Sequence, residues 1–379
     1  MSCKQNNTQS NTNSNVTGEI LQTTQTPPDV ANNSDGFYRQ LKGKIGTAEV
    51  QMSLVKVGTK LYGKYAYSRI GQLIDLSPRG TEENIDADGK FVLFEFATNK
   101  DGEYDQTGTF NGQILPNGLV KGVWTSADEK KNLNFELNDA PSNDAADISI
   151  SIIEKQEGDC EGESEATCAH FEVIYPTIKQ LPDRNEQTKQ LINTTILNVL
   201  AESMPTEQTT APDKAAEQFL RDFKDQDSEY KMSWEYELTT EVYQNANNIL
   251  SIGFANYIFT GGAHPNHSES YYNFNLKTGQ LIELDDVFKP KYETQLTALA
   301  EQKIRSLHNI GAKSPLSEAG FLEDKFELND NFSISATGIT FLYNPYEITP
   351  YAMGEQLIFI SFKEVKDLLQ PNGLINWSF

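Results

Sequence analysis

Alternation of apolar and polar residues dominates the chain between residues 36 and 139. It holds in the runs 48–54, 60–67, 91–96, 107–112, 118–124 and 132–137. A period of two is typical of half-buried β-strands, and Gly, Asp and Asn separate the runs at hairpin distances. The pattern therefore predicts an all-β N-terminal domain, a small antiparallel barrel or sandwich of about seven or eight strands.

Two of these runs share the form apolar-x-Gly-x-aromatic, at 61–65 and 120–124. A Gly inside a strand often marks a bend or bulge, which the closure of a barrel requires. Small barrels are usually filled by their own side chains, so we expect a filled interior. The alternative is an interior that holds a ligand.

The pattern changes after a linker at 140–144. Strands are expected at 148–152, 171–175, 234–242, 249–259, 270–276, 332–334, 338–343 and 356–360, with a turn at 244–248. Helical spacing appears at 187–204, from Pro212 onward, at 291–308 and at 362–369. Segregated strands and helices are typical of an α+β fold, with helices on one face of an antiparallel sheet. We divide the chain into a tether (1–35), a barrel-like domain (36–139), a companion domain (146–255) and a C-terminal domain (256–379), the last two forming one unit.

Charge narrows the classes of partner. The 379 residues carry a formal net charge of -23, and the sequence pI is near 4.6. This argues against nucleic acid, whose phosphates require Lys and Arg, and against electrostatic attraction to anionic lipid. An acidic surface favours a basic partner by raising the rate of association, although acidity also serves solubility alone.

The three cysteines suggest export. Cys3 stands before a run of Asn, Gln, Ser and Thr that cannot bury enough apolar surface to order itself. This arrangement resembles a mature bacterial lipoprotein after removal of its signal peptide, with the lipid on Cys3. Cys160 and Cys168 close a short polar loop, and we expect a disulfide there, since His170 alone adds too few ligands for zinc. No apolar run reaches the roughly 18 residues of a membrane helix. We therefore expect a cell-envelope protein that meets the membrane only through this lipid.

A set of ordered motifs resembles a known extracellular domain. The chain has Thr260-Gly261-Gly262-Ala263-His264, then Tyr271-Tyr272-Asn273-Phe274-Asn275, Thr278-Gly279-Gln280 and Leu284-Asp285-Asp286-Val287-Phe288. It later has Tyr343-Asn344-Pro345-Tyr346-Glu347-Ile348-Thr349-Pro350-Tyr351-Ala352-Met353-Gly354. These motifs resemble the RsiV-like C-terminal domain shared by a lysozyme-sensing anti-sigma factor and a peptidoglycan deacetylase. Residues 146–255 resemble the companion domain that precedes it, and the barrel lies outside the resemblance.

The resemblance implies recognition and not catalysis. The chain lacks the sigma-binding segment and membrane span of the anti-sigma factor, and the catalytic domain of the deacetylase. We expect a non-enzymatic lipoprotein without cofactor or bound metal, whose partner is a basic lysozyme-like protein or a peptidoglycan fragment. The expected ligand-binding residues are Thr260, Gly261, Gly262, Ala263, His264, Tyr271, Tyr343, Tyr346 and Tyr351.

Two alternatives stay open at these residues. His264 and His267, near Glu283, Asp285 and Asp286, suit a metal-dependent cell-wall hydrolase or deacetylase. The Gly261-Gly262 pair instead suits a structural loop that packs His264 below Tyr271 and Tyr346. The tyrosines of 343–354 suit either an exposed binding loop or the closed end of a core.

Overall fold

The computed structural model describes residues 36–78, 80, 83–98, 104–160, 167–206, 209, 211–226 and 232–376. The predicted tether, 1–35, and the lipidation predicted at Cys3 lie outside the described residues. Within the described ranges, no helix combines the length and apolar character that crossing a membrane demands.

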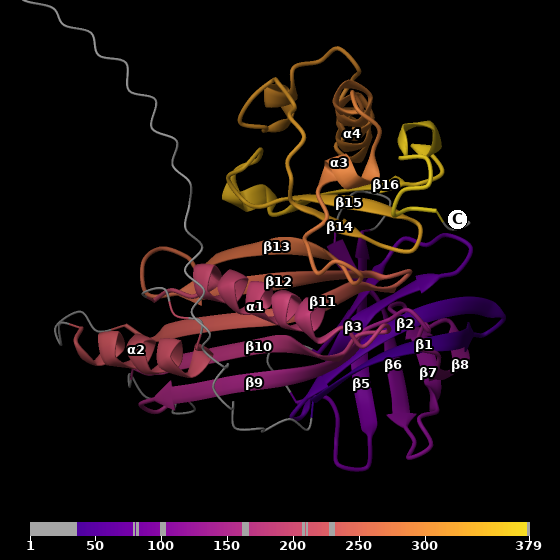
Figure 1. The fold of residues 1–379 in the computed structure, drawn as a ribbon. Helices are drawn as coiled ribbons and strands as arrows, with labels where there is room; N and C mark the ends of the chain where they lie inside the picture. The colour runs from indigo at the N-terminus through magenta and orange to yellow at the C-terminus, as the bar shows by residue number, and fades with distance from the viewer. Residues whose placement is uncertain are drawn as a thin grey trace, which may run out of the picture. The chain divides into compact units, whose positions relative to one another are not determined.

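Eight antiparallel strands form the N-terminal barrel, drawn from indigo to purple in Figure 1. They are β1 (Gly36–Ile45), β2 (Ala48–Val57), β3 (Lys60–Tyr67), β4 (Ile74–Ser77), β5 (Lys90–Thr98), β6 (Tyr104–Ile114), β7 (Val120–Ser126) and β8 (Asn132–Asp139). Strand β1 pairs with both β2 and β8, which closes the barrel. The predicted all-β fold is confirmed, and β1 and β4 add two strands to the six predicted runs.

The two glycines of the shared motif, Gly63 and Gly122, lie where neighbouring strands of the barrel wall approach closely, and the pairing keeps its register at both, so no bulge forms there. A Cβ atom at Gly63 would collide with the carbonyl oxygen of Ser53 on the next strand, and one at Gly122 with that of Asn111. Neighbouring backbones therefore approach more closely than a side chain permits.

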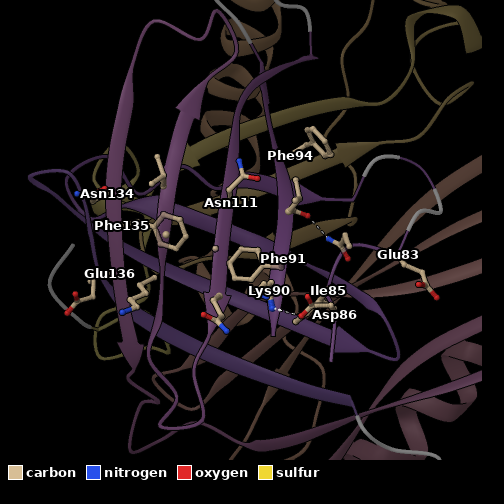
Figure 2. Close-up of a pocket in the computed structure, with 18 of the residues that line it drawn as sticks. Glu83, Ile85, Asp86, Lys90, Phe91, Phe94, Asn111, Asn134, Phe135 and Glu136 are labelled. Carbon is tan, nitrogen blue, oxygen red and sulfur yellow. Dashed lines mark hydrogen bonds between the residues drawn. The ribbon is translucent and has the colours of Figure 1, made fainter. Parts of the chain in front are cut away.

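The barrel interior has its own core, which runs from Leu41 to Leu137. The buried Glu95 carboxylate accepts hydrogen bonds from Tyr65, Thr107 and Trp124 at 2.6–2.7 Å, so its polar atoms are satisfied there. Beside this core, an open hollow lies along β1 and β5–β8 (Figure 2). The rings of Phe91 and Phe135 line it, together with glycines that contribute no side chain.

A second group of strands continues the same sheet. They are β9 (Asp147–Glu157), β10 (Ala169–Gln180), β11 (Trp234–Ala246), β12 (Ile249–Phe259) and β13 (Asn266–Asn275). Gly36 of β1 pairs with Ile150 of β9, so the barrel and this group share one hydrogen-bonded sheet of 13 strands. The pair β10–β11 is parallel, an exception to the predicted antiparallel pairing, because two helices bring the chain back between these strands.

Those helices cover one face of the sheet, as predicted (Figure 1). Helix α1 (Glu186–Ser203) begins at Asn185, whose side chain accepts hydrogen bonds from the amides of Gln187 and Thr188 at 3.1 Å. Helix α2 (Pro212–Lys224) begins with Pro, which suits the first helical position. The faces buried against β9 and β10 include Ile192, Ile196, Leu200, Phe219 and Phe223.

The turn between β11 and β12 is shorter than the predicted 244–248. Strand β11 ends at Ala246 and β12 begins at Ile249, so the turn consists of Asn247 and Asn248. Their positive φ values of 57° and 58° fit a two-residue hairpin turn. Asn245 is buried in β11 because its side chain bonds the backbone N–H and carbonyl of Ala146, at 2.8 and 2.9 Å. Sequence composition favours a turn for these polar residues, but this distant partner keeps them in the strand.

The remaining elements form a core of their own. They are α3 (Leu284–Val287), α4 (Glu293–Leu307), η1 (Leu316–Ala319), β14 (Phe332–Ile334), β15 (Gly338–Tyr343), η2 (Tyr351–Met353), β16 (Gln356–Ser361) and η3 (Lys366–Leu368). The predicted closing helix at 362–369 is wrong: only the short turn η3 forms there. The side chain of Glu364 accepts hydrogen bonds from the N–H and hydroxyl of Ser361, a local alternative to helical bonding.

Candidate functional site

The loop between β12 and β13 carries the motif Thr260–His264. Gly261 and Gly262 have φ values of 107° and 104°, so the chain leaves the strand in a conformation that favours Gly, as predicted. The side chains of Thr260, Ala263 and His264 are exposed. The sharp exit therefore projects His264 from the end of a rigid strand pair.

Four rings gather at this loop, and we call His264, His267, Tyr346 and Tyr351 the ring cluster. His264 stacks on Tyr351 with centroids 4.1 Å apart, and His267 meets the same ring edge-on at 5.4 Å. Tyr346 lies 5.8 Å from Tyr351 and is 57% exposed. The sequence-predicted residues His264, Tyr346 and Tyr351 thus come together in space.

Hydrogen bonds fix the orientation of these rings. His264 Nδ1 lies 2.8 Å from the carbonyl oxygen of Pro265, which can only accept, so Nδ1 carries the proton. Nε2 is then free to accept, and the Tyr346 hydroxyl lies 3.5 Å from it. The Tyr351 hydroxyl donates to the same Pro265 carbonyl at 2.8 Å. The cluster is a preorganised surface with an exposed polar edge.

Tyr271 and Tyr343 lie apart from the ring cluster. Tyr343 is 2% exposed within the C-terminal core, and its hydroxyl donates to the carbonyl of Glu327 at 2.8 Å. Tyr271 is 8% exposed, and its hydroxyl lies 3.2 Å from a carboxylate oxygen of Glu269. The ring below His264 is Tyr351 and not Tyr271. The sequence predicts the tyrosines of 343–354 either in a core or in an exposed binding loop. Tyr343 lies in the core, and Tyr346 lies in an exposed loop.

The ligands of the alternative metal site do not assemble. Glu283 and Asp286 form a capping box at the start of α3, with the Glu283 N–H donating to Asp286 at 3.0 Å. In the part of the chain that the structure describes, the groups of His and carboxylates close enough to share an ion centre on His170, and neither contains His264 or His267. The geometry at His264 favours a contact surface over a metal centre.

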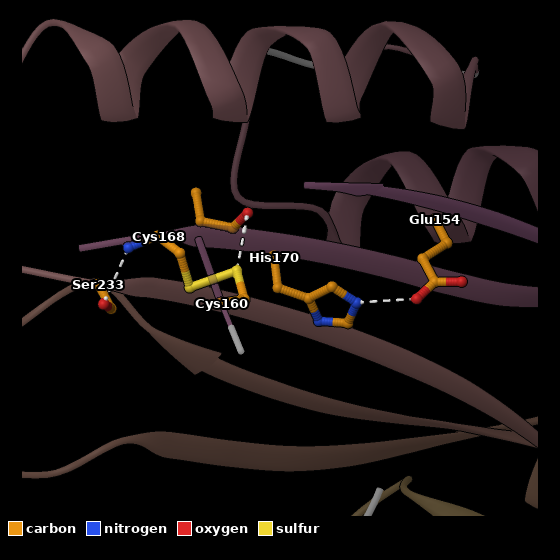
Figure 3. Close-up of a disulfide and its surroundings, with 6 residues drawn as sticks. Glu154, Cys160, Cys168, His170 and Ser233 are labelled. Atoms are coloured by element: carbon orange, nitrogen blue, oxygen red, sulfur yellow. Dashed lines mark hydrogen bonds and ion pairs between the residues drawn. A yellow bond between two sulfur atoms is a disulfide. The ribbon is translucent and has the colours of Figure 1, made fainter. Parts of the chain in front are cut away.

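The disulfide and His170 lie side by side at the β9–β10 connection (Figure 3). Cys160 and Cys168 are joined, as predicted, with Cα atoms 5.1 Å apart. His170 Nε2 lies 3.3 Å from Glu154, and Glu172 on the same strand is paired at 2.6 Å with Lys60 of β3. The cysteines are bonded to each other and Lys60 neutralises Glu172, so the group of Glu154, His170 and Glu172 already has a cation.

Sequence reasoning missed an acidic cavity where the barrel meets the following strands. Its volume is about 1140 Å³, and its walls come from β3–β6, β10, β11, β13 and β16 with the segment before it. The charged residues that line it are Lys60, Lys64, Asp75, Glu172, Glu237, Glu241, Glu269 and Glu355. Six carboxylates thus face two ammonium groups.

Lys64 lies at the centre of this cavity's charge network. Its ammonium contacts the carboxylates of Asp75 and Glu241, and lies 4.8 Å above the ring of Tyr243. Burial alone would lower the pKa of Lys64, but Asp75 and Glu241 outweigh it and hold the pKa well above its usual range. Lys64 stays charged and links strands β3, β4 and β11.

Glu269, unlike Lys64, is held in its uncharged form. Burial, together with the neighbouring Glu241 carboxylate, raises the pKa of its carboxyl to about 8. The Tyr243 hydroxyl hydrogen-bonds Glu269, while Asn344 and Asn331 hold its backbone N–H and carbonyl. Glu269 therefore keeps its proton near neutral pH, although it shares the cavity with a lysine.

Weak sequence signals existed for this site. Lys64 lies in a strand whose residues are buried on both faces, and Glu241 and Glu269 lie next to Thr, Val or Ser in strands of mixed polarity. A charged residue at such a position is rarely buried without a partner. The partners lie up to about 200 residues apart in the chain, so no local pattern could connect them.

Comparisons with known proteins match two adjoining stretches of the chain. Residues 162–267 match the family model "Deacetylase PdaC", and residues 285–363 match "Protein of unknown function (DUF3298)". The predicted RsiV-like resemblance is confirmed: the chain carries a DUF3298 domain and, before it, a PdaC domain. The loop of His264 falls in the first match, and Tyr346 and Tyr351 fall in the second.

The chain is also similar to individual proteins. It is 26% identical over 161 residues to the peptidoglycan-N-acetylmuramic acid deacetylase PdaC of Bacillus subtilis, across 42% of this chain and 34% of the relative. The chain thus spans about a third of that relative's length. A DUF3298 family structure from Bacteroides fragilis matches with a TM-score of 0.49 and 20% identity, over 60% of this chain and 96% of that one. Another, from Pseudomonas aeruginosa, matches with a TM-score of 0.44 and 17% identity, over 59% and 94%.

Proposed function

We propose that this chain, with its PdaC and DUF3298 domains, is a cell-envelope protein that binds peptidoglycan glycan without cleaving or modifying it. One observation carries the proposal: the ring cluster beside the tip of the β12–β13 hairpin, in which His264 and Tyr346 are exposed. Aromatic rings contribute a large contact area at low entropic cost, and their polar tips can hydrogen-bond hydroxyls. Stacked, oriented rings suit the apolar faces of sugar rings.

The likeness to a peptidoglycan deacetylase supports a cell-wall ligand and a location in the cell envelope. The geometry gives no comparable support for catalysis, because Glu283 and Asp286, the candidate metal ligands beside His264, form a helix cap. We also propose that Cys3 carries the lipid that holds the protein at a membrane. Replacing Cys3 by Ala should then release the protein from the membrane fraction of its native cells.

Binding to isolated peptidoglycan sacculi tests the proposal. The wild type should co-sediment with sacculi, and His264→Ala and Tyr346→Ala should each weaken that binding about tenfold, a loss of about 1.4 kcal/mol. Leu191→Ala is the matched control, because Leu191 is 46% exposed on α1, away from the cluster. The proposed site would be refuted if the wild type did not bind sacculi, or if both ring variants bound them as tightly as the wild type does.

The same mixtures test for enzyme activity. A non-catalytic binder releases neither soluble fragments nor free amino groups from sacculi, with or without added divalent metal. Release that depends on the protein and disappears in His264→Ala would instead establish a metal-dependent hydrolase or deacetylase at this loop.

A basic lysozyme-like protein is a second candidate ligand. The observation that favours it is the net charge of -23, which raises the association rate with a cationic partner. Titration with lysozyme in a calorimeter should then give binding that weakens with salt and is reduced by Tyr346→Ala. Lysozyme binding without sacculus binding would select this candidate over the glycan.

A further inference from the structure

The acidic cavity holds more negative charge than its lysines neutralise. Lys60 is occupied by Glu172, and Lys64 by Asp75 and Glu241. Among the residues that the structure describes, no Lys or Arg forms an ion pair with Glu237, Glu269 or Glu355, which all line the cavity. A cation that enters would find three carboxyl groups that no lysine or arginine holds in an ion pair.

Glu237 gives an independent sign of a missing group. Its Oε1 atom is inaccessible to solvent and has no hydrogen-bond partner within the described ranges. Buried polar atoms are nearly always paired, and an exception calls for a donor that is absent. Burial raises the pKa values of Glu237 and Glu355, and outweighs the opposing charges of Lys60 near the first and of His267 near the second.

The cavity mouth combines this charge with flat apolar surface. Phe96 and Tyr104 stack with centroids 5.8 Å apart and planes at 15°. The Tyr104 ring is 55% exposed, and its hydroxyl donates to Asp75. Ile70 and Leu357, 66% and 43% exposed, also line the cavity, and exposed apolar side chains that share a cavity mark a binding site.

We propose that the acidic cavity binds an amino sugar whose amine is free and protonated, such as a de-N-acetylated glucosamine unit of cell-wall glycan. This rests on the proposed glycan-binding function and gives the chain a second site. In an oligomer, the ammonium of one sugar unit donates to Glu237 and that of another unit to Glu269, and the apolar face of a sugar stacks on Tyr104. An N-acetylated sugar offers a neutral amide and cannot neutralise the carboxylates. A lysine side chain brings the same ammonium, but it has no ring for the aromatic pair.

Calorimetry with defined oligomers tests the proposal on the full chain. The probes are a glucosamine tetramer, an N-acetylglucosamine tetramer and tetralysine, at pH 6 and low salt. The wild type should bind the glucosamine tetramer at least tenfold more tightly than the other two. Binding should release a proton, because a nearby cation favours the ionised form of Glu269.

Two sets of variants identify the cavity. Glu237→Gln/Glu269→Gln keeps size and shape, and should weaken glucosamine binding at least tenfold and abolish proton release. Tyr104→Ala, on the exposed rim, should weaken it without abolishing proton release. The charge-matched control is Glu49→Gln/Glu318→Gln, since both residues are exposed and lie outside the cavity lining; it should bind as the wild type does.

The outcomes separate this proposal from the first. Equal binding of the two sugar tetramers, an equal loss in the control variant, or no glucosamine binding at all overturns the inference. If tetralysine binds more tightly than the glucosamine tetramer, and the same variants weaken its binding, the amino-sugar proposal is overturned and the ligand of the cavity is a basic peptide. In each case the ring cluster is judged separately, because sacculus binding is measured with His264→Ala and Tyr346→Ala.

Discussion

Replacing Lys64 by Met should destabilise the protein strongly and in a pH-dependent way. Lys64 is 6% exposed, and its ammonium touches two carboxylates, Asp75 and Glu241. Removing one partner of a buried ion pair leaves an uncompensated charge, which costs about 3–5 kcal/mol. The side chains of Asp75 and Glu241 are 30% and 26% exposed, and solvent screens them in part. We therefore expect a loss of about 3 kcal/mol at pH 7, the lower end of that range.

The loss should shrink in acid. Without Lys64, the folded state holds two partly buried carboxylates that no cation compensates, whereas the unfolded chain keeps them solvated. Protons remove this unfavourable charge from the folded state, so the stability of the variant falls as pH rises. Urea unfolding followed by tryptophan fluorescence should show the full loss at pH 7 and a smaller one at pH 4.5.

The controls make this result specific. Lys121→Met removes an exposed lysine of β7 that forms no ion pair within the described ranges, and should change stability by less than about 0.5 kcal/mol. Adding Glu241→Gln to Lys64→Met should restore part of the loss, because it removes one orphaned charge. A loss below about 1 kcal/mol at pH 7, or an equal loss at both pH values, would refute this account of the network.

Three further predictions concern stability. Phe219 of α2 packs on Phe171 and Trp234, at 5.5 and 5.4 Å between ring centroids. Phe219→Ala should therefore lower the free energy of unfolding, measured in urea, by about 3–5 kcal/mol, and a loss below about 1 kcal/mol would contradict that packing. Cys160→Ser opens a loop of sequence separation 8, and the chain-entropy account gives a loss of about 2.5 kcal/mol, which dithiothreitol should reproduce in the wild type but not in the variant. Glu269 has a folded pKa of about 8 against an ordinary value near 4.5, so its ionisation costs stability as pH rises between these values. Glu269→Gln cannot ionise, and should gain stability relative to the wild type from pH 5 to pH 9; a difference that does not change with pH would contradict the shifted pKa.

The sequence determined much of the secondary structure and predicted three of the four residues of the ring cluster. Alternation in 36–139 and the glycines at 63 and 122 predict a barrel, because a period of two and a bend in a strand are local properties. The Gly261-Gly262 pair predicts the sharp exit that carries His264, since positive φ is a property of single residues. The motifs of 260–264 and 343–354 predict the family resemblance, with the first segment in the PdaC match and the second in the DUF3298 match.

Tertiary structure decided which residues face each other. Tyr343 and Tyr346 are three residues apart, yet one lies in the core and the other is exposed, because position relative to β15 and not residue type sets their burial. The acidic cavity joins Lys64, Glu241, Glu269 and Glu355, which come from β3, β11, β13 and the segment before β16. A desolvated charge depends on every group that surrounds it, and those groups meet only when β1 pairs with both β8 and β9 and brings the barrel against the later strands.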